Sequence, residues 1–180
     1  MKTALSAVLL GTALFFSVPQ SAMAQSLADS RQKIDALIET FRQAIINKDT
    51  AGFMQLFLRE DITWTAVYSD GSVDRYNASL KDPKEPRGTK IQNSSPRKFI
   101  ESIARAKETM AETFSNVRID TDGDVAQVWF DYTFIAGDYK NNWGKESWQL
   151  VRTEAGWKIA AVVWSAEENP VPRVLPKGAN

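Results

Sequence analysis

The sequence predicts an α+β domain in which helices cover one face of an antiparallel sheet. Apolar residues recur at spacings of three and four in the first part of the chain, which is the helical period. From about residue 112 the period changes to two, which is typical of half-buried strands. Short turn signals separate these strands, so they are expected to pair as an antiparallel meander.

Three helices are predicted before the meander. The first is expected to begin at Ser30 or Asp29, either of which can cap it, and to bury one apolar stripe. That stripe consists of Ile34, Leu37, Ile38, Phe41, Ala44 and Ile45. Asp49 or Thr50 is expected to cap a shorter helix. Its apolar residues are Phe53, Met54, Leu56 and Phe57.

The third helix is predicted to start at Ser95-Pro96, which have the residue types of an N-cap and a first helical position. One stripe joins Phe99, Ile100, Ile103, Ala106 and Met110. Between the second and third helices, residues 61–68 have strand composition. The turn signal SDGS at 69–72 predicts a second short strand at 73–76. Residues 77–94 are expected to form a loop, either plain surface or a functional flap.

The meander is predicted to contain strands at 112–119, 124–135, 145–153 and 157–165, joined by TDGD, GDYKNNWG and TEAG. Alternation around TDGD turns Thr113, Ser115, Phe130, Tyr132 and Phe134 toward the helices and Asp131 away from them. With Trp64 and Gln149, these five inward residues are the predicted ligand pocket. Asp131 is expected to form an outer ion pair or hydrogen bond, although a one-residue bulge would reverse its direction.

Alternation around TEAG predicts an outer row that is too apolar for an isolated monomer. The row contains Trp129, Trp148, Leu150, Val162 and Trp164. A homodimer that packs sheet on sheet would cover it, and the proline-rich tail at 167–180 is the alternative cover.

Composition excludes several classes of function. The chain has no cysteine and no histidine, which removes thiol chemistry and the commonest metal ligand and general base, so neither a metal nor a cofactor is expected. With 22 basic and 22 acidic residues, the chain has no net charge that would attract nucleic acid.

The first 24 residues have the layout of a secretory signal peptide. Lys2 precedes an apolar run and the small-residue site Ala22-Met23-Ala24, so cleavage is expected after Ala24. The run is shorter than the roughly 20 residues of a spanning helix. We therefore expect a periplasmic or secreted protein without a membrane span, with a leader at 25–29.

Several segments in this order resemble the nuclear transport factor 2-like superfamily, and its SnoaL-like and ketosteroid-isomerase-like bacterial branch in particular. They are KDTAGFMQLF, DITW, the DGD-V-A strand entry and LVRTEAGWKIAAVVWS, and the resemblance covers residues 30–166. It implies a cone-shaped barrel of a strongly bent antiparallel sheet packed on a long N-terminal helix and two shorter helices. It also implies an enclosed pocket and a homodimer joined through the outer sheet face.

Fold does not determine function, so three functions are considered. The predicted pocket contains no carboxylate, which favours a domain that binds a small hydrophobic or amphipathic molecule without catalysis. The alternatives are a cofactor-independent isomerase, cyclase or dehydratase, and an association module whose cone is filled by its own side chains. A carboxylate beside Tyr132 within an open cavity would favour the enzyme.

Overall fold

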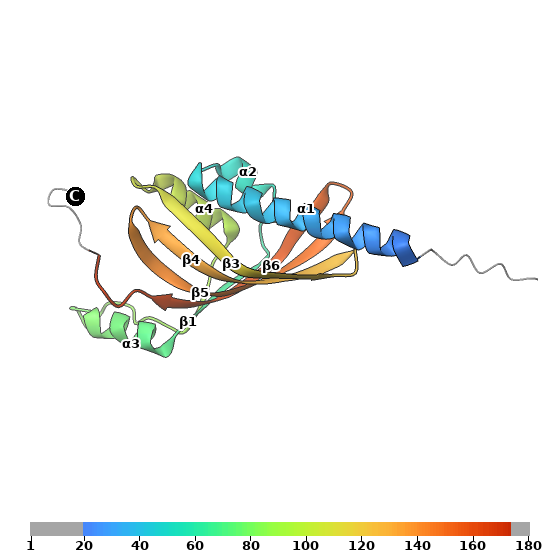
Figure 1. Ribbon diagram of the computed structural model, residues 1–180. Coiled ribbons are helices and arrows are strands. Elements are labelled where there is room, and N and C mark those ends of the chain that lie inside the picture. Colours follow the sequence, from blue (N-terminus) through green and yellow to red (C-terminus); the bar gives the residue numbers. More distant parts are fainter. Residues whose placement is uncertain (1–19, 174–180) are drawn as a thin grey trace, which may run out of the picture.

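The computed structural model describes residues 20–173, with side chains from Ala24 onward. The elements are α1 (Gln20–Ile46), α2 (Thr50–Met54), β1 (Thr63–Tyr68), α3 (Asp70–Ser79), β2 (Ile91–Asn93), α4 (Pro96–Arg105), β3 (Met110–Thr121), β4 (Val125–Ala136), β5 (Tyr139–Thr153) and β6 (Gly156–Glu168). Figure 1 shows α1, α2 and α4 on one face of a curled, unclosed sheet, with α3 apart from them. We call the face under these three helices the inner face. The predicted α+β class is confirmed.

The sheet has the strand order β2-β1-β6-β5-β4-β3. β1 runs parallel to β6, and the other neighbouring pairs are antiparallel. The predicted meander is therefore confirmed as β3 to β6. Among residues 20–173, no helix has the length and apolar character that crossing a membrane requires.

The helices form where the local signals predict them, with one change of boundary. All six residues of the predicted α1 stripe are buried, but α1 begins at Gln20, so Ser30 and Asp29 lie inside the helix and do not cap it. Asp49 caps α2 by accepting a 2.9 Å hydrogen bond from the Gly52 amide. Ser95 caps α4 in the same way, with Pro96 at the first helical position. α4 ends at Arg105, so Met110 belongs to β3.

The SDGS segment begins a helix, and the predicted strand at 73–76 is wrong. Ser69 accepts a 3.0 Å hydrogen bond from the Ser72 amide and so caps α3. β1 does not need a hairpin partner at this point because β6 pairs along its whole length. The predicted loop at 77–94 shortens to residues 80–90, since α3 extends to Ser79 and β2 starts at Ile91.

A β-bulge reverses the predicted alternation of β3. The strand pairs Ser115 with Asp131 but Arg118 with Trp129, so two residues, Asn116 and Val117, lie opposite one. Asn116 has a φ of 54°, in the left-handed region that bulges use. Beyond the bulge, Thr113 and Ser115 point outward, and their neighbours Phe114 and Glu112 point inward.

Two further deviations change the faces of β5 and β6. The turn at 154–155 pairs Thr153 with Gly156, one residue away from the register predicted around TEAG. Ala160 is then an extra residue in β6, since Leu150 pairs with Ile159 and Gln149 with Ala161. As a result, Trp157 and Trp164 both reach the inner face.

The predicted outer row is therefore mostly core. Trp148, Leu150 and Val162 are fully buried within the monomer, and Trp164 is half-buried on the inner face. Only Trp129 of that row stays on the outer face, with 41% of its surface exposed. The expected loop GDYKNNWG is also wrong, because β5 begins at Tyr139 after a turn in which Gly137 has a φ of 65°.

Candidate functional site

The inner face and the helices enclose a cavity of about 160 Å³, which we call the inner cavity. Its apolar walls come from α1, α4 and the sheet. They consist of Phe41, Trp64, Tyr68, Phe99, Tyr132, Phe134 and Trp164. Trp64 packs against two of these rings, with its ring centroid 5.4 Å from those of both Phe99 and Trp164. Three polar side chains also line the cavity, namely Glu112, Asn142 and Glu146.

The two carboxyl groups reach the cavity from different strands. Glu112 lies in β3 beyond the bulge at 116–117, which turns it inward. Glu146 lies in β5 opposite Trp164, so both share the inner face. The exposed fractions are only 5% for Glu112 and 4% for Glu146. Neither carboxyl forms an ion pair within residues 20–173.

Burial without a cation favours the neutral form of both acids. Burial raises the pKa of the Glu146 carboxyl to about 7, against an opposing hydrogen bond from the indole of Trp148. That bond joins Trp148 Nε1 to Glu146 Oε1 over 2.5 Å. Burial, followed by the negative charge of Glu146, raises the pKa of Glu112 well above its usual range. Burial therefore favours the protonated form of Glu112, which can donate a hydrogen bond, and both forms of Glu146 are populated near neutral pH.

Tyr132 adds a second donor to the same cavity. Its hydroxyl is buried and has no hydrogen-bond partner in the described part of the chain. Burial, and then the charges of Glu146 and Glu112, raise the pKa of Tyr132, so the hydroxyl keeps its proton. An unsatisfied buried hydroxyl costs about 1–3 kcal/mol, which a ligand acceptor in the cavity would offset.

The structure brings together part of the predicted pocket. Trp64, Tyr132 and Phe134 line the inner cavity. Phe130 is buried on the inner face but packs against Trp148 and Phe114 instead of the cavity. Thr113, Ser115 and Gln149 were predicted inward and are exposed, because of the bulge in β3 and the one-residue change at the β5–β6 turn.

Asp131 points outward as predicted. Its carboxylate forms an ion pair with Lys145 and accepts a 2.6 Å hydrogen bond from Asn116, and both lower its pKa. The prediction missed Glu112 and Glu146. One sequence signal could have found Glu146, since it alternates with Trp148 and Leu150, which are too apolar to face solvent.

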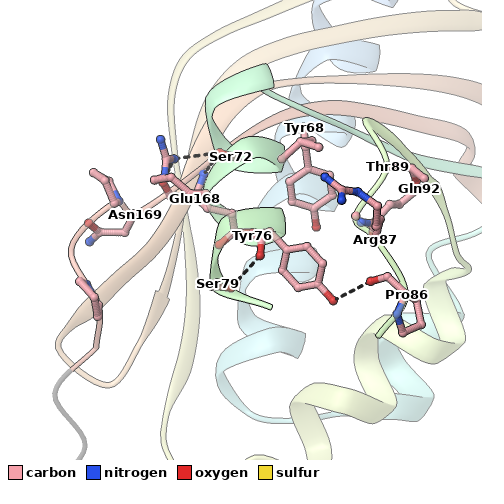
Figure 2. Close-up of a pocket in the computed structure, with 15 residues that line it drawn as sticks. Tyr68, Ser72, Tyr76, Ser79, Pro86, Arg87, Thr89, Gln92, Glu168 and Asn169 are labelled. Carbon is pink, nitrogen blue, oxygen red and sulfur yellow. Dashed lines mark hydrogen bonds between the residues drawn. The ribbon is translucent and has the colours of Figure 1, made fainter. Parts of the chain in front are cut away.

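A second hollow of about 660 Å³, which we call the mouth groove, lies between α3, residues 86–92 and residues 168–172. Figure 2 shows Tyr68, Tyr76 and Arg87 around this groove. Tyr68 ends β1 and lines both hollows. The mouth groove and the inner cavity therefore adjoin at Tyr68.

Comparison with solved structures supports the same fold. A nuclear transport factor 2-like protein with a cystatin-like fold from Novosphingobium aromaticivorans is 12% identical, with a TM-score of 0.58 over 83% of this chain and 90% of that one. A candidate scytalone dehydratase from the same organism is 15% identical, with a TM-score of 0.57 over 88% and 99%. A candidate dehydratase of the nuclear transport factor 2-like family from Streptomyces avermitilis is 15% identical, with a TM-score of 0.52 over 78% and 97%.

These likenesses show that the chain has the nuclear transport factor 2-like fold, as the resemblance of its sequence implies. No protein-family model and no curated protein sequence matches it.

Proposed function

We propose that this chain is a cofactor-independent enzyme that moves a proton on a small carbonyl compound bound in the inner cavity. One observation carries the proposal, namely two buried carboxyl groups without cations beside an unpartnered Tyr132 hydroxyl in an otherwise aromatic cavity. Paired titratable groups with raised pKa values in a cavity are typical of general acid–base sites. From the sequence, ligand binding without catalysis is preferred to an enzyme; the structure leads us to prefer the enzyme.

The three groups divide into one base and two hydrogen-bond donors. The Glu146 carboxylate, held by Trp148, accepts a proton from the carbon next to the substrate carbonyl. The electron pair of the broken C–H bond moves onto the carbonyl oxygen, which becomes an enolate. The neutral Glu112 carboxyl and the Tyr132 hydroxyl stabilise that oxygen by hydrogen bonds. If Glu146 returns the proton to another carbon of a conjugated enolate, the product is an isomer. If Glu146 passes the proton to a hydroxyl on the β carbon, that group leaves as water while the carbonyl re-forms beside a new C=C bond, and the product is that of dehydration.

The size of the cavity limits the reacting part of the substrate. A dry apolar cavity of about 150 Å³ is known to hold one benzene molecule. The inner cavity, at about 160 Å³, therefore suits a single six-membered ring. An open volume of this size argues against an association module with a filled cone.

Simple ligand binding is the second candidate, favoured by the aromatic walls of the cavity. Export, either to the periplasm or out of the cell, also belongs to the proposal, since residues 1–19 of the expected signal peptide lie outside the described residues. We retain the homodimer with a changed contact surface. Trp129 pairs with Ser147, which pairs with Val163, so Trp129 and Val163 belong to one exposed row on the outer face.

The catalytic proposal is tested with cyclohexanone, a ketone of the size of one ring. The protein should accelerate the exchange of the α-protons of cyclohexanone for deuterium in deuterium oxide, which proton NMR measures. The exchange rate should rise as Glu146 loses its proton near pH 7. Glu146→Gln keeps the shape and removes the base, so exchange should slow by about 100-fold or more. Tyr132→Phe removes one donor and should slow it by a similar factor of about 100.

Asp131→Asn is the matched control, because Asp131 is a carboxylate on the outer face of the same sheet. It should exchange at the rate of the parent. If Glu146→Gln exchanges the protons at the parent rate, or if the parent exchanges them no faster than buffer alone, the catalytic proposal is rejected and ligand binding is the better-supported function.

A further inference from the structure

We propose that the mouth groove binds an anionic group at the far end of the substrate and that Arg87 is its partner. The substrate would then have two parts, a reacting ring in the inner cavity and an acidic tail that passes Tyr68. This inference rests on the proposed function, because it assigns the groove to the same molecule.

The volumes are the first argument. The inner cavity holds about one ring, whereas the adjoining groove has a volume of about 660 Å³. Tyr68 belongs to both walls, so a molecule anchored by its ring beside Glu146 would leave the cavity at the inner end of the groove. Its remaining atoms would lie between α3 and residues 86–92.

The charges are the second argument. Two arginines line the groove, and Arg75 is already engaged by Glu167, the Ser72 hydroxyl and the Glu168 carbonyl. Arg87 makes no ion pair and no hydrogen bond with any residue in the range 20–173. Glu168 is the one carboxylate on the groove wall; burial raises the pKa of its carboxyl, and it forms no ion pair with Arg87. Arg87 is therefore a cation on the groove wall that no carboxylate of the described residues contacts.

The backbone beside Arg87 is held in place, which is the third argument. The amide of Gly88 donates a 2.9 Å hydrogen bond to Asn77 Oδ1 in α3. The loop packs so closely on Tyr76 that a Cβ at Gly88 would lie 2.6 Å from that ring. Two residues further on, the Tyr68 amide donates to the Lys90 carbonyl over 2.8 Å. A cation on a fixed backbone loses less freedom when it binds a carboxylate.

The test uses ω-phenylalkanoates, from phenylacetate to phenylhexanoate, and their uncharged amides. Each places a ring in the inner cavity, next to Trp64 and Trp164, so binding can be followed by tryptophan fluorescence at low salt. When the chain is too short to reach Arg87, the carboxylate should bind no more tightly than the amide, because the inner cavity holds no cation. Once the chain reaches it, the carboxylate should bind about 5-fold more tightly, as expected for one ion pair with an exposed side chain.

Arg87→Gln should remove this preference and leave the affinity for the amides unchanged. Lys84→Gln removes the same charge from the same loop but outside the groove, and should keep the preference. Added salt should reduce it in the parent. Equal affinity of acid and amide at every chain length, no binding of any acid, or a preference that survives Arg87→Gln would each overturn the inference.

These measurements require no turnover and are independent of the exchange experiment. A preference that depends on Arg87, in a chain that does not exchange cyclohexanone protons, would support the groove and reject the catalytic role of Glu146. Proton exchange in a chain that shows no preference for the carboxylates would support the catalytic role of Glu146 and reject the groove.

Discussion

Replacing Glu146 by glutamine should stabilise the protein at alkaline pH, because the buried acid opposes folding when it is ionised. The pKa of Glu146 rises from 4.5 to about 7 on folding. Where a carboxyl has a higher pKa in the folded state, stability is greatest at low pH and falls as pH rises from the unfolded value to the folded one. Between about pH 5 and about pH 8 this group alone should remove about 2–3 kcal/mol of folding free energy.

The difference between variant and parent isolates this effect from the other titrating groups. Glutamine has the same shape and keeps an oxygen acceptor for Trp148 Nε1. In urea unfolding, the stability advantage of Glu146→Gln over the parent should therefore grow by about 2–3 kcal/mol from the lower to the higher pH. In thermal unfolding, the same change corresponds to about 4–12 °C in melting temperature.

Asp131→Asn is the opposite case. Lys145 and Asn116 lower the pKa of Asp131, so this carboxylate stabilises the fold above its unfolded pKa and the variant should lose stability there. An advantage for Glu146→Gln that is the same at both pH values, or that is larger at the lower one, would show that the Glu146 carboxyl is solvated and would refute the reasoning.

Two further predictions concern the sheet. Asn116 has a left-handed backbone, so the free energy of unfolding of Asn116→Gly in urea should stay within about 1 kcal/mol of the parent. Asn116→Val should lose about 2 kcal/mol more, because a β-branched residue is strained there. Equal losses would mean that the bulge does not depend on this residue. Trp129→Arg should convert the proposed dimer into a folded monomer in light scattering, because Trp129 is exposed on the outer face; a parent chain that is already monomeric would reject the contact.

Local signals were sufficient for most of the fold. Asp49 and Ser95 cap helices through contacts within three residues of themselves, and such contacts can be read from the sequence. SDGS was misread because serine, aspartate and glycine favour both a tight turn and a helix start. The choice depends on β6, which pairs with β1 from a hundred residues further along the chain.

The candidate site was harder to predict because strand faces depend on counting. One extra residue in β3 and another in β6 each reverse which side chains point inward in the rest of that strand. Neither Asn116 nor Ala160 predicts a bulge from its residue type alone. Tyr132 and Asp131 were placed correctly because β4 runs without interruption from Val125 to Phe134. Glu112 and Glu146 were missed because each lies beyond an error in register.

The bulge at residues 116–117 also matters for comparing this chain with distant relatives of the same architecture. Against a relative whose third strand had no bulge, an ungapped alignment would match Thr113 or Ser115 to cavity positions, whereas one gap at residues 116–117 would match Glu112. Loss of one codon there would remove an acid from the interior without any amino-acid replacement among the residues that surround it. In a bulged strand, the deletion or insertion of one residue can therefore change the cavity lining as much as a substitution can.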